Sequence, residues 1–259
     1  MQLVNYRIYG ESNLKTIYIL HGIFGMLDNW HLAAQQLSAQ YRVVTFDARN
    51  HGKSFHDADS SFRAMATDLY NLIHHLGDGN NTSIIMGHSM GGKTAMFFAE
   101  HHSELVEKLI VVDIAPKQYV PGHLSYFKAF REVDLSQMNS RREVEEAFAP
   151  YAPEMGVRQF LLKNIEPQPD GGYKTKSNLE AIEHWYPTII DRLDFMDVFN
   201  KPTYFIAGSK SGYIKEEDKP YILQHFPHSK FYVVENAGHW VHAENPQGFL
   251  EAVQNALQN

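Results

Sequence analysis

Short apolar runs alternate with longer amphipathic stretches along most of the chain. The runs are rich in β-branched and aromatic residues, and they occupy residues 16–20, 42–46, 83–86, 109–112, 203–207 and 230–234. Runs that are apolar at nearly every position are typical of strands buried on both faces, as in a parallel sheet covered by helices. Helical patterns lie at about residues 29–39, 61–76, 90–101, 216–226 and 246–257. The alternation predicts an α/β fold with an open sheet, because the eight regular repeats of a closed barrel are missing.

The alternation is interrupted between residues 115 and 200. This stretch is charged, rich in aromatic residues and contains seven prolines, and helical patterns persist in it at residues 140–149 and 177–185. An insertion of this length after a strand is typical of a small helical cap over an active site. The sequence therefore predicts a single domain over residues 1–259, with a core of residues 1–114 and 201–259 and a lid insertion at about 115–200.

Composition narrows the function classes. The 259 residues are 44% hydrophobic, and 23 Lys and Arg against 30 Asp and Glu give a net charge of −7. An acidic chain without a basic run disfavours nucleic acid and anionic membranes as partners. The absence of cysteine excludes thiol nucleophiles and disulfides, and it fits the reducing cytoplasm. Because the start of the sequence shows no signal-peptide pattern, we expect a cytoplasmic protein. The sequence does not indicate an oligomeric state.

The most specific motif is Gly87-His88-Ser89-Met90-Gly91. It lies directly after a predicted strand and directly before a predicted helix, which is the context of a nucleophile elbow. Small neighbours are needed because such a tight strand-to-helix turn leaves no room for bulky side chains. The helix that follows directs its N-terminal N–H groups and positive dipole end toward a developing anion. The motif predicts Ser89 as a catalytic nucleophile.

A serine nucleophile needs a base, and one of the 15 histidines is placed to provide it. His239 follows Gly238 in the loop after the last predicted strand, so it is expected at the same edge of the sheet as Ser89. His242, three residues further on, is the weaker alternative. The other paired histidines lie next to each other on helices, where neighbours do not share a face. The sequence therefore predicts His239 as the general base.

The acidic partner of the histidine is less clearly marked. In this kind of fold the chain order is Ser, acid, His, and the usual position of the acid is the loop after the strand at 203–207. That loop, residues 208–213, contains no carboxylate. Asp113 ends the strand at 109–112, one strand from the elbow, so its carboxylate can reach a histidine above Ser89. We predict Asp113 as the acid, and more remote alternatives are Glu180, Asp191 and Asp197.

Two backbone N–H groups are expected to stabilise an oxyanion. One is that of Met90, directly after the nucleophile. The other comes from the glycine-rich loop after the strand at 16–20, where Ile23 is the first choice and Phe24 the close alternative. Several aromatic side chains are weaker candidates for the substrate pocket, among them Phe24, Trp185 and Trp240. The chemistry expected of this set is acyl transfer, which requires neither a metal nor an organic cofactor.

These motifs together resemble those of the α/β-hydrolase superfamily, and most closely the small bacterial esterases of the YbfF type. The resemblance is carried by four segments, at residues 21–25, 47–54, 87–92 and 238–244, and by the phrases at 27–30 and 112–116. It implies an eight-stranded, mostly parallel sheet with a helical lid after the sixth strand. It also implies esterase or thioesterase activity on a small acyl ester or acyl thioester.

Residue by residue, the resemblance supports Ser89, His239 and Asp113 as the catalytic groups. The YbfF-type group tends to lack the acid after the seventh strand, as this chain does. Three alternatives remain open at this stage. A carbon–carbon bond hydrolase or a lyase on the same scaffold shares the serine and the histidine loop, and a ligand receptor can retain the fold without catalysis.

Overall fold

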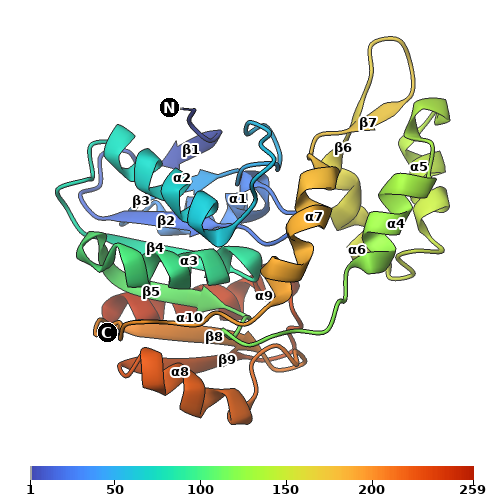
Figure 1. Ribbon diagram of the computed structural model, residues 1–259. Helices are drawn as coiled ribbons and strands as arrows, with labels where there is room; N and C mark the ends of the chain where they lie inside the picture. Colours follow the sequence, from blue (N-terminus) through green and yellow to red (C-terminus); the bar gives the residue numbers. More distant parts are fainter. Residues whose placement is uncertain (1) are drawn as a thin grey trace.

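A computed structural model of the chain describes residues 2–259 and shows one central twisted sheet (Figure 1). The sheet has seven strands in the order β1-β3-β2-β4-β5-β8-β9. Their bounds are β1 (Tyr6–Tyr9), β2 (Thr16–Leu20), β3 (Arg42–Phe46), β4 (Ser83–His88), β5 (Val106–Val112), β8 (Thr203–Gly208) and β9 (Ser229–Val234). All pairs are parallel except β1 with β3. The predicted α/β-hydrolase fold is confirmed.

The number of strands differs from the eight that the resemblance implied. Within residues 2–259 the sheet contains seven, because residues 2–5 form no strand outside β1. The antiparallel strand β1 is therefore the edge of the sheet. As a further consequence, the long insertion follows the fifth strand of the sheet, β5, and not a sixth.

Neighbouring residues on each strand enter two different hydrophobic cores, because side chains alternate across a strand. On β2, Ile17 and Ile19 pack in one core with helices α1 (His31–Leu37) and α10 (Pro246–Gln258). Tyr18 and Leu20 pack in the other core with α2 (Phe62–His75), α3 (Met90–His101) and α8 (Lys219–His225). The sheet is thus covered on both faces, as the continuous apolar strands predicted, and α2, α3 and α8 form the near layer in Figure 1.

The segment between β5 and β8 projects to one side of the sheet (Figure 1). We call residues 115–200 the inserted segment. Its helices are α4 (Leu124–Glu132), α5 (Arg141–Phe148), α6 (Met155–Leu161) and α7 (Leu179–Ile190), and a two-stranded hairpin is formed by β6 (Ile165–Pro167) and β7 (Tyr173–Thr175).

Short helical turns complete the chain. The 3-10 turns are η1 (Leu27–Trp30), η2 (Ser103–Leu105), η3 (Leu135–Gln137), η4 (Leu162–Asn164) and η5 (Glu216–Asp218), and the helix α9 (Val241–Glu244) directly precedes α10. No helix within residues 2–259 is long and apolar enough to cross a membrane.

Candidate active site

Ser89 occupies the sharp turn between β4 and α3. Its backbone has φ 53° and ψ −119°, a conformation that costs energy for a residue with a side chain. The turn depends on its glycines: a Cβ on Gly87 would lie 2.1 Å from the carbonyl oxygen of Gly91, and one on Gly91 would lie 2.5 Å from that of Leu20. The nucleophile elbow expected from the sequence is therefore formed, with Ser89 at the end of a central strand.

His239 and Asp113 meet at the same end of the sheet. His239 follows β9, Asp113 follows β5, and the imidazole Nδ1 lies 2.8 Å from the carboxylate Oδ2. The Asp113 carboxylate is fully buried, and it also accepts hydrogen bonds from Ser211 Oγ at 2.5 Å and from the Gly208 N–H at 3.1 Å. Three donors thus converge on one carboxylate. Within residues 2–259, His239 makes an ion pair or hydrogen bond with no other acidic side chain.

The protonation states follow from burial and hydrogen bonding. Burial raises the pKa of Asp113, and the hydrogen bonds from Ser211 and Gly208 act in the opposite direction. Burial lowers the pKa of His239, so its imidazole is neutral at pH 7. The contact with Asp113 assigns the single imidazole proton to Nδ1, which leaves Nε2 as an acceptor. A neutral imidazole with a free Nε2 is the form that a general base requires.

Two further contacts orient the histidine. The ring of Tyr213 stacks on the imidazole with centroids 3.7 Å apart, and His88 Nε2 donates to the backbone oxygen of His239 at 2.8 Å. Ser211 and Tyr213 belong to the loop after β8. The sequence showed only that this loop lacks a carboxylate, and it did not indicate a role for either residue. No spacing rule marks them, since their contacts form only when β5, β8 and β9 are brought together. Ser89 Oγ and His239 are not joined by a hydrogen bond within the described chain.

The candidate oxyanion donors lie next to the serine. Met90 begins α3, so its N–H belongs to the first turn of a helix and has no partner in that helix. Ile23 and Phe24 follow β2, and Phe24 has a positive φ of 59°. The N–H groups of Ile23, Phe24 and Met90 find no acceptor among residues 2–259. All three are therefore available to a ligand oxygen.

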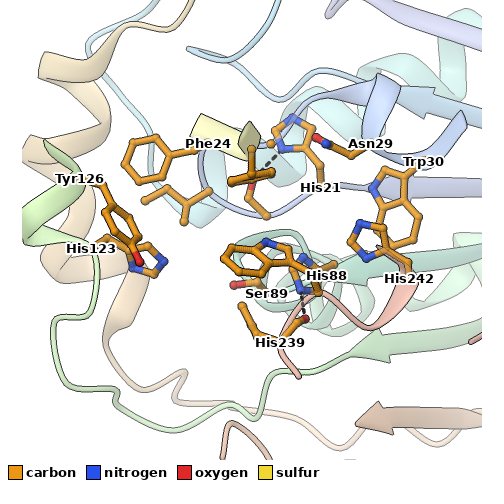
Figure 2. A pocket seen from close by; sticks show the side chains of 15 residues that line it. His21, Phe24, Asn29, Trp30, His88, Ser89, His123, Tyr126, His239 and His242 are labelled. Carbon is orange, nitrogen blue, oxygen red and sulfur yellow. Dashed lines mark hydrogen bonds between the residues drawn. The ribbon is translucent and has the colours of Figure 1, made fainter. Parts of the chain in front are cut away.

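Two cavities meet at Ser89. The larger has about 450 Å³ of empty space, the open solvent at its mouth included, and contains His239 in its wall. The smaller, with about 360 Å³ counted in the same way, extends between α3 and the inserted segment. Ile23, Ser89 and His123 line both. Figure 2 shows His123 and Tyr126, from the inserted segment, facing Ser89 and His239 across the larger cavity. Ser89 is thus located where the two cavities join.

The predicted pocket residues have different outcomes. Phe24 and Trp240 line the larger cavity. Trp185 lines neither cavity, because its indole N–H points the other way and donates to the Ala58 oxygen at 2.8 Å. The prediction for Trp185 was wrong for a geometric reason: consecutive helix residues point about 100° apart, and on α7 it is Tyr186 that faces the smaller cavity.

The remaining candidates from the sequence stand apart from the serine–histidine pair. His242 lines the larger cavity, but its ring stacks on Trp30 with centroids 4.3 Å apart. The side chain of Asp191 accepts from the neighbouring Arg192 N–H.

His123, which the sequence did not indicate, accepts at Nδ1 from the Tyr186 hydroxyl at 2.9 Å, since that hydroxyl already accepts two backbone N–H bonds. Its Nε2–H is left as a possible donor.

Comparisons with known proteins cover nearly the whole chain. The family described as "alpha/beta hydrolase fold" matches residues 15–246. The curated "sn-1-specific diacylglycerol lipase ABHD11" of Danio rerio is 37% identical over 258 residues, which cover 96% of this chain and 80% of that protein. "Esterase YbfF" of Escherichia coli is 33% identical over 250 residues, covering 96% and 95%. The solved structure "Marine microorganism esterase" is 37% identical with a TM-score of 0.94, covering 98% and 99%.

Proposed function

The chain belongs to the α/β-hydrolase fold family, and from this premise we propose that it is a serine esterase that cleaves carboxylic esters through an acyl-enzyme intermediate. Its relatives include proteins named as esterases and lipases. The single observation that carries the proposal is the His239–Asp113 contact of 2.8 Å beside a strained Ser89 elbow. Nucleophile, base and acid arranged in this way are recognised by geometry and role.

The first half of the reaction forms the acyl-enzyme. His239 Nε2 takes the proton of the Ser89 hydroxyl while Oγ attacks the ester carbonyl carbon. The carbonyl oxygen becomes an anion, and the N–H groups of Ile23 and Met90 donate to it. Asp113 keeps the imidazole proton on Nδ1 and stabilises the imidazolium that forms. The imidazolium then protonates the leaving oxygen or sulfur atom as its bond to the carbonyl carbon breaks, so that the alcohol or thiol departs neutral.

The second half releases the acid. Water enters, gives a proton to His239 and attacks the acyl carbon, and the Ser89 oxygen leaves with the proton that the histidine returns. The same two N–H groups serve both tetrahedral anions. Every step uses side chains and backbone groups of this chain, so the proposed reaction requires no cofactor.

The two cavities indicate where the acyl part and the alcohol or thiol part of a substrate bind. The group that protonates the leaving oxygen must lie on the leaving-group side, and His239 lines only the larger cavity. We therefore assign the larger cavity to the alcohol or thiol. The smaller cavity, with aliphatic and aromatic walls such as Ile189, Ile190 and Tyr186, then takes the acyl chain. An oxygen ester and an acyl thioester both fit this division.

We also propose that the inserted segment acts as a lid, as its place in the sequence predicted. It contributes His123, Tyr126 and Phe160 to the larger cavity and Ile189 to the smaller one. It is in contact with the core at a second place, where Asn164 Nδ2 donates to the Phe24 oxygen at 2.7 Å. A segment that lines both cavities and is attached around them is suited to exclude water from the acyl-enzyme.

The test is hydrolysis of nitrophenyl esters over a series of acyl chain lengths. Wild-type protein is expected to hydrolyse them, and Ser89→Ala is expected to lose at least about 10³-fold in kcat while keeping its fold. The longest chain that is turned over measures the depth of the acyl cavity. Folded protein that hydrolyses no ester at any length contradicts the proposal. Cleavage of a vinylogous diketone would then indicate a carbon–carbon hydrolase, and binding without turnover would indicate a receptor.

A further inference from the structure

A buried lysine lies one helical turn after the nucleophile. Lys93 is on α3, its backbone N–H donates to the Ser89 oxygen at 3.0 Å, and its side chain is only 1% exposed. No carboxylate within residues 2–259 lies within 4 Å of its amino group. A lysine in such a place is unusual, because burying an ammonium group without an acidic partner is costly. The reaction proposed above does not use it.

The amino group is bound to backbone oxygens from both ends of the inserted segment. We call residues 115–120 the entry connection and residues 189–193 the exit connection. Lys93 Nζ donates to the oxygen of Lys117 in the entry connection at 3.0 Å, and to those of Ile189, at 3.3 Å, and Asp191 in the exit connection. An ammonium group has three N–H donors and a neutral amine has two. Three acceptors therefore match the protonated form.

The two connections also pair with each other, through oxygens other than those that bind Lys93. The Tyr119 N–H donates to the Ile190 oxygen at 2.8 Å, and the Leu193 N–H donates to the Pro116 oxygen at 3.0 Å. The pairing uses the oxygens of Pro116 and Ile190. Ile189 and Ile190 are the last residues of α7, so their oxygens have no partner within that helix. The Ile189 oxygen, together with those of Lys117 and Asp191, is bound by the lysine instead.

A chain of contacts leads from Lys93 to the catalytic histidine. The amino group lies 5.0 Å from the centre of the Tyr119 ring, and the Tyr119 hydroxyl donates to the Tyr213 oxygen at 2.7 Å. Tyr213 in turn stacks on His239. Lys93 and Tyr119 also line the smaller cavity beside Ser89. Both the acyl cavity and the imidazole thus depend on where the two connections lie.

We propose that Lys93 is a positioning residue whose ammonium group fixes the entry and exit connections on the nucleophile helix, and so sets the shape of the acyl cavity and the stacking of Tyr213 on His239. Its effect on turnover rests on the proposed esterase function. Its effect on the two connections does not, because they can be observed without any substrate.

The protonation state of Lys93 gives a second way to test the proposal. Burial lowers the pKa of Lys93 to about 7, and the Asp191 charge acts against this. Lys117 lies over the same Tyr119 ring at 5.4 Å, and Asp218 pairs with it at 2.6 Å. The other titratable groups that line the smaller cavity are His123, Tyr119, Tyr186 and Tyr213. Burial lowers the pKa of the histidine to about 4 and raises that of each tyrosine, so these stay neutral between pH 6 and 9.

The test compares Lys93→Met with wild type by amide hydrogen exchange of Tyr119 and Leu193. The control is Lys128→Met, at a 54% exposed lysine on α4. Loss of the three bonds is expected to speed exchange at these two amides at least about tenfold, and to leave the control unchanged. The KM for long acyl esters is expected to rise about tenfold, and kcat for the acetyl ester is expected to fall by a smaller factor, because Tyr213 no longer holds His239 as firmly. Unchanged exchange in folded Lys93→Met overturns the proposal.

Wild-type protein supplies a second measurement that does not depend on the variant folding. Between pH 6 and 9 the ammonium loses one donor, so protection of Tyr119 and Leu193, corrected for intrinsic exchange, is expected to fall. Constant protection over that range overturns the proposal. If exchange responds as expected while no ester is hydrolysed, the esterase function fails and the role of Lys93 in fixing the connections stands.

Discussion

Replacing Asp113 by asparagine tests the centre of the site with almost no change of shape. The Asp113 carboxylate accepts from Ser211, Gly208 and the His239 Nδ1–H, and the last two bind different oxygens. An amide oxygen that keeps the Gly208 bond places the NH₂ group against Nδ1. Nδ1 must then accept, which moves the imidazole proton to Nε2, facing the serine. A histidine in that tautomer cannot take the Ser89 proton.

The expected magnitude is large for turnover and small for stability. Because the wrong tautomer removes general-base catalysis, kcat for a short nitrophenyl ester is expected to fall about 10³- to 10⁴-fold, or roughly 4–5.5 kcal/mol in activation free energy. Burial raises the pKa of Asp113, so ionising this carboxyl lowers the free energy of unfolding as pH rises above the ordinary pKa of an aspartate. The asparagine has no charge to bury and avoids this loss of stability. At pH 8 the variant is therefore expected to unfold within a few degrees of wild type.

The assay is steady-state hydrolysis together with thermal unfolding at pH 8. Asp197→Asn is the matched control, since Asp197 is exposed and its side chain does not contact His239. A folded Asp113→Asn protein with activity within tenfold of wild type would refute the reasoning, because it would show that another group sets the tautomer. An unfolded variant would refute the expected stability instead.

Two further substitutions have clear expectations. Ser211→Ala removes the hydroxyl that donates to Asp113 at 2.5 Å, and kcat/KM is expected to fall about 5- to 30-fold, whereas Ser209→Ala, in the same loop, is expected to change kcat/KM little. Equal rates for the two variants would exclude a role for Ser211. Gly91→Ala places a Cβ 2.5 Å from two backbone oxygens and is expected to cost about 2–4 kcal/mol of unfolding free energy. Gly156→Ala, in α6 with open space around it, is the control and is expected to be neutral or slightly stabilising in a denaturant titration.

The core of the fold could be predicted from the sequence because its signals are local. Each of the six predicted strands is present, and the five core helices begin or end within a few residues of their predicted bounds. The strand β1 was missed because Tyr6–Tyr9 is short and partly exposed, without a continuous apolar run. The helices α4 and α6 were missed among prolines and aromatic residues. The helix α7 continues through Pro187 to Ile190, beyond the end that its pattern indicated.

The site residues that directly follow a strand could likewise be predicted from the sequence, whereas those with distant partners could not. Ser89, Asp113 and His239 each follow a strand, so parallel-sheet geometry alone places them at one edge, and the structure brings the last two into contact. Their catalytic roles remain proposals until they are measured. The contacts of Ser211 and Lys93 could not be found from the sequence, because the hydrogen-bond partners of each are distant along the chain. Trp185 was misplaced because residue type does not reveal which way a helix is turned.

The pairing of β5 with β8 has a consequence for how this protein can be altered. The two strands are hydrogen-bonded neighbours, with Val112 opposite Ile206, although a segment of some ninety residues separates them along the chain. The inserted segment therefore leaves and rejoins the sheet at adjacent points, on two neighbouring strands. The residues that we propose as catalytic, Ser89, Asp113 and His239, lie outside this segment, whereas the segment supplies part of the walls of both cavities. Exchanging the inserted segment between relatives is thus a route to new substrate preferences. Each replacement must then place backbone oxygens where they can bind the amino group of Lys93.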